Sequence, residues 1–354
     1  MNFTDRFEFI KDKPARNRAV MAPMDTLMAT NGFANDFHIQ HYGARAYGGV
    51  GTIIVESTAV AENGRIREKD LGIWSDSHIE GLQRIVNISK QANAIIGIQL
   101  NHAGAKAEVA MPIIGATKFY DYLNQEQLKI ASHDDLQIIK QQFVDAAKRA
   151  KLAGFDFVEL HAAHGYFLSE LIHSKLNDVI KSPDIITRSQ LLIDIVNDIY
   201  DVVQIPVGIR VSFTDHAEGG MELAEYQPLV ELLNEKVSYW HVSSGETIAR
   251  VRMADVIADL GTKLFRLPIA ATVKKWTTKP VVVVGNFDSI ADVNEALVNN
   301  IDAIAFGRSL LYNPNFVITN LLKVDEIKQT DYHWNQNLWF DYHDYKNLIT
   351  NIIK

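Results

Sequence analysis

The chain has 354 residues, of which 47% are hydrophobic and 22% are charged, a balance typical of a globular protein with a large core. Its formal net charge of −8 argues against nucleic acid as a main partner, because phosphate binding needs a basic surface. Cysteine is absent, which excludes disulfides, iron–sulfur clusters, thiolate zinc sites and cysteine nucleophiles.

The N-terminal segment is charged and lacks the apolar stretch of a signal peptide. No run of the sequence approaches the roughly 18 apolar residues that span a membrane. We therefore expect a cytoplasmic protein without a membrane partner, and the sequence predicts no metal site. The length suits either one large barrel or two average domains.

Short apolar segments alternate along the chain with amphipathic segments of helical period. The expected strands are Arg18–Met21, Gly51–Glu56, Ile95–Leu100, Phe155–His161, Val207–Ser212, Tyr239–Ser243, Val281–Gly285 and Ala303–Gly307. The expected helices are Phe37–Tyr47, His78–Ala92, Asp134–Ala153, Arg188–Val203, Glu222–Lys236, Leu264–Trp276, Asp288–Asn299 and Ser309–Leu322. This α/β alternation predicts a (β/α)8 TIM barrel over about residues 17–323, within a single domain 1–354.

Capping and proline signals support these boundaries. Ser132 followed by Asp135 is typical of a capping box, and Asp288 stands where the next-to-last helix needs an N-cap. Pro206 and Pro280 each end a helical segment just before a strand.

Two segments fall outside the repeat. The stretch from Asn101 to His133 is long and irregular, and we expect it to cross the barrel mouth. The C-terminal extension, about 324–354, is rich in aromatic residues between Tyr332 and Tyr345. We expect a helical tail packed outside the barrel; a contact in a homo-oligomer or a wall of the active site are the alternatives.

Barrels of this class form active sites at the carboxyl ends of their strands. The first strand is followed by Pro23, Met24 and Asp25, and the second by Ser57. Residue types alone would assign these positions to the barrel rim.

Two polar side chains interrupt apolar strands. Gln99 needs a hydrogen-bond partner, and its amide offers both a donor and an acceptor to a ligand, although backbone groups could satisfy it equally well. Arg210 cannot be buried cheaply without an anionic or acceptor partner. An ion pair with Glu56 or Glu159 is the alternative to a ligand role for this arginine, and the two could coexist.

The segment Phe155–Tyr166, FDFVELHAAHGY, ends an apolar strand with three groups suited to chemistry: His161, His164 and Tyr166. Small residues between them leave room for a ligand. Two imidazoles and a phenol at a strand end favour a functional site over simple strand capping.

The last two strands predict a phosphate site. Gly285 and Asn286 follow the seventh strand, and Gly307 and Arg308 follow the eighth. Glycines let the backbone approach an anion closely, and the arginine adds charge-assisted hydrogen bonds.

ELHAAHGY, which ends at Tyr166, strongly resembles the substrate-binding motif of the Old Yellow Enzyme family of FMN-dependent NADH:flavin oxidoreductases and ene-reductases. The segment from Gly307 to Pro314 resembles the closing motif of the same family, and the resemblance runs from about Asn17 to Pro314. Asp25 departs from the family pattern, which has Thr or Cys there, and the loop after Tyr166 lacks the family's Tyr-Gly-Gly element.

The resemblance implies one non-covalently bound FMN. The cofactor-binding residues that it implies are Pro23, Met24, Asp25, Ser57, Gln99, Arg210, Gly285, Asn286, Gly307 and Arg308. It places Arg210 at the N1/O2 edge of the flavin and Asp25 beside its N5/O4 edge.

The resemblance also implies catalytic roles. NAD(P)H would reduce the flavin, and hydride would then pass to an electron-poor alkene such as an enone. His161 and His164 would bind the substrate carbonyl, and Tyr166 would act as general acid. Two alternatives stay open: a flavin-binding protein with degenerate or altered catalysis, and a TIM-barrel lyase or isomerase acting on a phosphorylated substrate.

Overall fold

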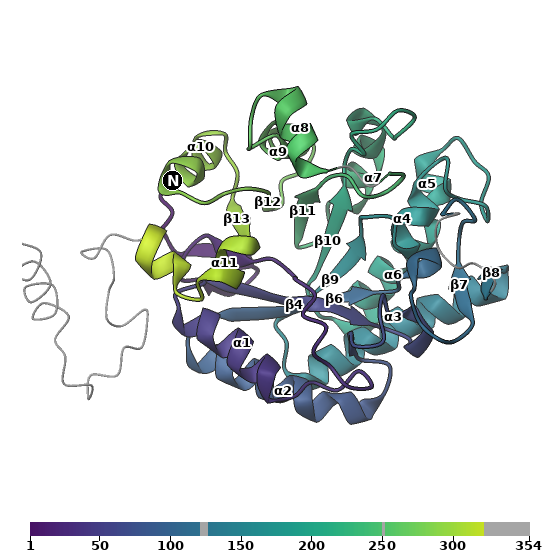
Figure 1. Cartoon of the computed structure of the whole chain (residues 1–354), viewed down its shortest axis with the longest axis horizontal. Coiled ribbons are helices and arrows are strands. Elements are labelled where there is room, and N and C mark those ends of the chain that lie inside the picture. The colour runs from purple at the N-terminus through teal and green to yellow at the C-terminus, as the bar shows by residue number, and fades with distance from the viewer. Residues whose placement is uncertain (121–126, 250–251, 322–354) are drawn as a thin grey trace, which may run out of the picture.

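The computed structural model describes residues 1–120, 127–249 and 252–321, and its central feature is a closed parallel β-barrel (Figure 1). Its strands are β3 (Ala19–Met21), β4 (Thr52–Ala59), β6 (Ile95–Asn101), β9 (Phe157–Ala162), β10 (Val207–Ser212), β11 (Tyr239–Ser243), β12 (Val281–Val284) and β13 (Ala303–Phe306). Each pairs in parallel with the next, and β3 pairs with both β13 and β4, which closes the ring. The predicted (β/α)8 TIM barrel is confirmed.

Helices surround the barrel, and α1, α2 and α3 cover one side of it (Figure 1). The longer helices are α1 (Asp36–Tyr47), α2 (Ile79–Gln91), α3 (His133–Ala153), α6 (Gln190–Asp198), α7 (Gln227–Leu233), α8 (Met253–Leu260), α9 (Arg266–Val273) and α10 (Ile290–Val298). The shorter ones are α4 (Phe167–Ile172), α5 (Ile185–Arg188) and α11 (Arg308–Tyr312). The expected helix Arg188–Val203 is split: α5 ends at Arg188, and α6 runs into a π-helical turn at Ile199–Val203.

The capping predictions have different outcomes. Ser132 and Asp135 form the predicted capping box of α3. The prediction that Asp288 caps α10 is wrong by one residue, because Ser289 Oγ accepts the N–H of Asp292 at 3.2 Å. The carboxylate of Asp288 pairs instead with Lys263, at 2.7 Å.

A hairpin that the sequence did not predict closes the amino-terminal end of the barrel. It consists of β1 (Phe7–Ile10) and β2 (Lys13–Ala15), which pair antiparallel. The ring of Phe9 lies 5.5 Å from that of Phe157 and 4.7 Å from that of Tyr239, at the first residues of β9 and β11. The hairpin therefore covers the end of the barrel that lies opposite the carboxyl ends of the strands.

The irregular stretch after β6 contains β7 (Ile113–Gly115) and β8 (Leu128–Ile130). Glu170 of α4 holds this stretch against the barrel, because its buried carboxylate accepts the N–H groups of Ala105 at 2.7 Å and Ala116 at 2.6 Å. The expected C-terminal extension lies outside the described residues. Within the described part of the chain, no helix is long and apolar enough to cross a membrane.

Candidate active site

A cleft of about 850 Å³ lies at the carboxyl ends of the barrel strands. Its lining comes mainly from the segments after β3, β12 and β13, from β10 and from the start of α9. The predicted residues that line it are Pro23, Met24, Arg210, Gly285, Asn286, Gly307 and Arg308. Residues distant in the sequence are thus brought to one cavity, as the strand-end argument predicted.

Three arginines face this cleft. Arg210 is buried on β10, and its Nε has no hydrogen-bond partner among the described residues. Arg308 donates a hydrogen bond to the side-chain oxygen of Asn286. The third, Arg266, is the first residue of α9 and was missed from the sequence, where an arginine within the apolar run LFRLPI was the available signal. Three guanidinium groups around one cavity, none of which forms a salt bridge among the described residues, are suited to an anionic ligand.

The alternative for Arg210, an ion pair with Glu159 or Glu56, is not formed. Glu159 instead accepts hydrogen bonds from Tyr239 at 2.9 Å and His241 at 2.8 Å. Although burial acts to raise it, the pKa of Glu159 lies below its usual value because His241, Arg210 and Tyr239 stabilise the charged form. Arg210 thus acts on Glu159 through its charge without forming a salt bridge to it.

The side-chain amide nitrogen of Gln99 has a hydrogen-bond partner inside the barrel. Its Nε2 donates to Glu159 Oε1 at 2.8 Å, so the donor that was expected to meet a flavin is used by the protein. The side-chain carbonyl remains to accept a hydrogen bond from a ligand.

His161, His164 and Tyr166 converge, as the motif predicted. The ring of His161 lies 5.1 Å from that of His164 and 4.9 Å from that of Tyr166, nearly perpendicular to both. His161 Nδ1 accepts the N–H of Ala163 at 3.3 Å, which puts the ring proton on Nε2. His164 Nε2 lies 2.8 Å from the hydroxyl of Ser243.

The electrostatics of these three groups suit hydrogen-bond donation without charge. Burial, with Arg210 as the next cause, puts the pKa values of His161 and His164 well below their ordinary range. Burial and the nearby carboxyls of Asp25 and Asp70 raise the pKa of Tyr166. At neutral pH the two imidazoles are uncharged and the phenol keeps its proton.

The turn between His164 and Tyr166 requires unusual backbone angles. His164 has φ +60° and Gly165 has φ +71°. A Cβ added at Gly165 would lie 2.2 Å from the hydroxyl of Tyr120, so only glycine fits. Lys106 supports the turn, since its Nζ donates to the carbonyl of His164 at 2.8 Å.

Asp25 lies beside other carboxyl groups. It lines a pocket of about 540 Å³ next to α1, and its charge acts on the carboxyl groups of Glu56 and Asp70. Carboxyl groups that repel one another in this way hold their protons more tightly. Burial raises the pKa of Glu56 to about 8 and that of Asp70 to about 7, with Asp25 contributing in both cases.

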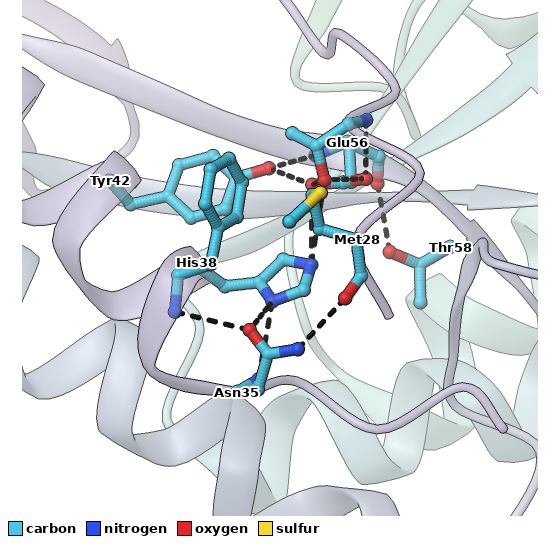
Figure 2. A network of polar contacts seen from close by, with 8 residues as sticks. Met28, Asn35, His38, Tyr42, Glu56 and Thr58 are labelled. Carbon is cyan, nitrogen blue, oxygen red and sulfur yellow. Dashed lines mark hydrogen bonds and ion pairs between the residues drawn. The ribbon is translucent and has the colours of Figure 1, made fainter. Parts of the chain in front are cut away.

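Glu56 anchors the loop that carries Pro23, Met24 and Asp25. Figure 2 shows Tyr42 and His38 of α1 pointing toward this carboxyl group. Tyr42 donates to it at 2.8 Å, and the N–H of Thr26 donates at the same distance. The loop after β3 is thus joined to β4 and α1 through one buried side chain.

Ser57 lies within β4, whereas the expected strand ended at Glu56. The register of β4 against β6 shifts between Val55 and Thr58, and Ser57 lies in this irregularity, where it is buried. The structure describes no group of three or more His, Asp or Glu residues that could hold a metal ion, within the ranges given above.

These features fit FMN. The phosphate of FMN is an anion that the arginines of the cleft can bind, and Gly285 and Gly307 let the chain approach it closely. The unpartnered Nε of buried Arg210 supplies a donor at the base of the same cleft.

Comparisons with known proteins agree with this geometry. The profile of the NADH:flavin oxidoreductase / NADH oxidase family matches residues 9–323. The NADPH dehydrogenase of Geobacillus thermodenitrificans is 37% identical over 308 residues, covering 84% of this chain and 88% of that protein. The NADPH dehydrogenase of Bacillus subtilis is 35% identical over 319 residues, covering 88% and 91%.

Solved structures show the same fold. Morphinone reductase superposes with a TM-score of 0.74 at 21% identity, over 94% of this chain and 96% of that one. A 2-naphthoyl-CoA reductase superposes with a TM-score of 0.79 at 21% identity, over 89% of this chain and 51% of that one. The chain therefore belongs to the NADH:flavin oxidoreductase / NADH oxidase family, that of the Old Yellow Enzyme, and is an FMN-dependent oxidoreductase reduced by a nicotinamide nucleotide.

Proposed function

We propose that this protein is an ene-reductase, which takes electrons from NADPH or NADH and reduces an electron-poor alkene such as an enone. The observation that carries the proposal is the convergence of two uncharged imidazoles and one protonated phenol beside the cleft. The curated relatives are named NADPH dehydrogenases, which supports NADPH as the reductant. A cytoplasmic location stays a prediction from the sequence.

FMN, when bound, supplies the hydride that reaches the alkene. The protein's own part begins with the substrate carbonyl. His161 carries its proton on Nε2 and donates it in a hydrogen bond to the carbonyl oxygen. Because the imidazole is neutral, it stabilises the developing oxyanion without passing it a proton.

His164 acts with Ser243. When the Ser243 hydroxyl donates to His164 Nε2, the ring proton stays on Nδ1 as a second donor for the same carbonyl oxygen. Arg210 keeps both imidazoles uncharged by electrostatic repulsion, in addition to the effect of burial.

Tyr166 supplies the proton for the alkene carbon. Its raised pKa keeps the phenol protonated over the whole neutral range, so the acid is always present in its active form. The ring of His161, 4.9 Å away, holds the phenol in place by edge-to-face packing.

The first test is the visible absorption spectrum of the purified protein. We expect a yellow protein that releases a flavin with one phosphate on heating, and that turns over an enone with NADPH. Colourless protein that takes up no added FMN would reject the cofactor assignment. FMN binding without enone turnover would reject only the ene-reductase proposal.

Retention of the flavin also separates this reading from the lyase or isomerase alternative, for which the comparisons give no support.

A further inference from the structure

Arg266 stands at the carboxyl ends of β11 and β12, and its side chain is 8% exposed. Its Nε donates to the hydroxyl of Ser244 at 2.8 Å, and its Nη2 donates to the carbonyl of Ser244 at 3.1 Å. These two bonds hold the plane of the guanidinium group in one orientation.

The remaining nitrogen of this group, Nη1, faces the end of β12. A Cβ added at Gly285 would lie 2.7 Å from Nη1, so any side chain at Gly285 would collide with the guanidinium group. Gly285 also has φ +140°, which disfavours every other residue. Arg266 and Gly285 are thus packed against each other at the wall of the cleft.

The charge of Arg266 is not balanced by the protein. Burial lowers the pKa of Arg266 to about 10, and repulsion from Arg210 and Arg308 adds to this effect. Glu246 is an acid that acts on it from a distance, and the described residues give Arg266 no salt bridge. A buried cation that two further cations repel is costly unless an anion binds near them.

The position of Nη1 indicates which anion this is. TIM barrels bind phosphate with the loops after their seventh and eighth strands, which here are the segments of Gly285 and of Gly307 with Arg308. We propose that Arg266 binds the phosphate of FMN together with Arg308, and that it makes the cleft select FMN over riboflavin. The inference rests on FMN as the cofactor and not on the identity of the alkene.

The test compares FMN with riboflavin, which has the same ring and ribityl chain but no phosphate. Apoprotein is titrated with each flavin, and binding is followed by quenching of flavin fluorescence. In Arg266→Gln we expect the Kd for FMN to rise about 10- to 100-fold, the range of one charge-assisted hydrogen bond. The Kd for riboflavin should change less than about threefold.

Two further variants act as controls. Arg266→Lys keeps the positive charge but loses the planar set of N–H donors of the guanidinium group. Its FMN affinity should therefore lie between those of the wild type and Arg266→Gln. Lys263→Gln removes a positive charge close by, from a side chain that pairs with Asp288 and Asp292, and should leave both affinities unchanged.

Each outcome decides the inference. Equal losses of FMN and riboflavin affinity in Arg266→Gln, or no loss of either, would overturn it. If the wild-type protein binds no FMN, both the cofactor assignment and the role of Arg266 are overturned. If the wild type binds FMN and Arg266→Gln binds it equally well, only the role of Arg266 is overturned. If Arg266→Gln shows no folded circular dichroism spectrum, Arg266→Lys decides, and unchanged FMN affinity there, at both low and high salt, contradicts the proposal.

Discussion

Tyr166 shows how the surroundings of one side chain determine its role. Its phenol lies against His161 and near two carboxyl groups, and both burial and those charges oppose its ionisation. A phenol in such a place keeps its proton until a strong base, such as a developing carbanion, needs it. This is the behaviour required of a general acid and not of a base.

We therefore expect Tyr166→Phe to slow alkene reduction by about 10²- to 10⁴-fold, the usual contribution of a general acid. Reduction of the bound flavin by NADPH should keep its wild-type rate, because that step needs no protonation by Tyr166. Stopped-flow absorbance would measure the two half-reactions separately. Equal losses in both would show that Tyr166 positions ligands and does not donate a proton.

Asp25 is a second residue whose charge depends on its neighbours. Where the resemblance places a hydrogen-bond donor beside the flavin, this chain has a carboxyl group that contacts Glu56 and Asp70. Burial away from water raises the pKa of Asp25 and is the largest cause of its shift.

We expect Asp25→Asn to raise the midpoint potential of bound FMN at neutral pH. A full negative charge about 7 Å from the ring, at an effective dielectric constant of about 20, would lower the potential by roughly 50 mV. Protons held by Asp25, Glu56 and Asp70 reduce this lowering of the potential at low pH. The lowering grows as Glu56 and Asp70 lose their protons near pH 7 to 8. The wild type should therefore show a steeper dependence of potential on pH than the mutant.

Spectroelectrochemical titration at several pH values would measure both quantities. A mutant potential that stays unchanged or falls would show that Asp25 does not act on the flavin ring.

At the scale of elements, the buried carboxyl group of Glu56 joins the loop after β3 to β4 and α1 (Figure 2). Its pKa is raised from 4.5 to about 8, so the folded protein holds this proton more tightly than the unfolded chain does. The resulting stabilisation is fully present below pH 4.5 and is lost as the pH rises through about 8.

We expect Glu56→Gln to remove part of this pH dependence, because an amide does not titrate. Between pH 5 and 8 the free energy of unfolding should fall with pH in both proteins, because Asp70 titrates in this range in each of them. It should fall more steeply in the wild type, because Glu56 titrates there as well. Urea unfolding at a series of pH values would measure the slopes. Parallel curves would mean that Glu56 is ionised in the folded protein at neutral pH.

At the scale of the whole molecule, the two ends of the barrel differ in structure. The carboxyl end holds the cleft, while the hairpin of β1 and β2 closes the other end with Phe9. Phe9 is 1% exposed and contacts the rings of Phe157 and Tyr239. Stability and cofactor binding should therefore respond independently to substitutions at the two ends.

We expect Phe9→Ala to cost about 3–5 kcal/mol of stability, the usual range for a buried phenylalanine. The affinity for FMN should be unchanged under conditions where the protein is folded. Phe7→Ala, on the half-buried ring two residues earlier, is the matched control and should cost less. A loss for Phe9→Ala no larger than that of the control would show that the hairpin does not contribute to the core.

The sequence determined the features that depend on neighbours along the chain. Alternation of apolar strands with amphipathic helices specified the barrel, because each βα unit buries its own apolar face. The order Leu160, His161, His164, Tyr166 placed three functional groups at one strand end, because a strand and its following turn hold them within a few residues. The glycines at positions 285 and 307 predicted an anion site because barrels commonly bind phosphate with the loops after their seventh and eighth strands.

Other features were decided only by the tertiary structure, because they join residues far apart in the sequence. The sequence singled out Asp25 but not its neighbours Glu56 and Asp70, and the raised pKa values of these carboxyl groups follow from their burial close together in the folded chain. Arg266 read as one arginine of an amphipathic helix, and only the closure of β11 beside β12 packs it against Gly285. Burial and charge act through space, so the pKa values and partners at the site depended on contacts that no local pattern records.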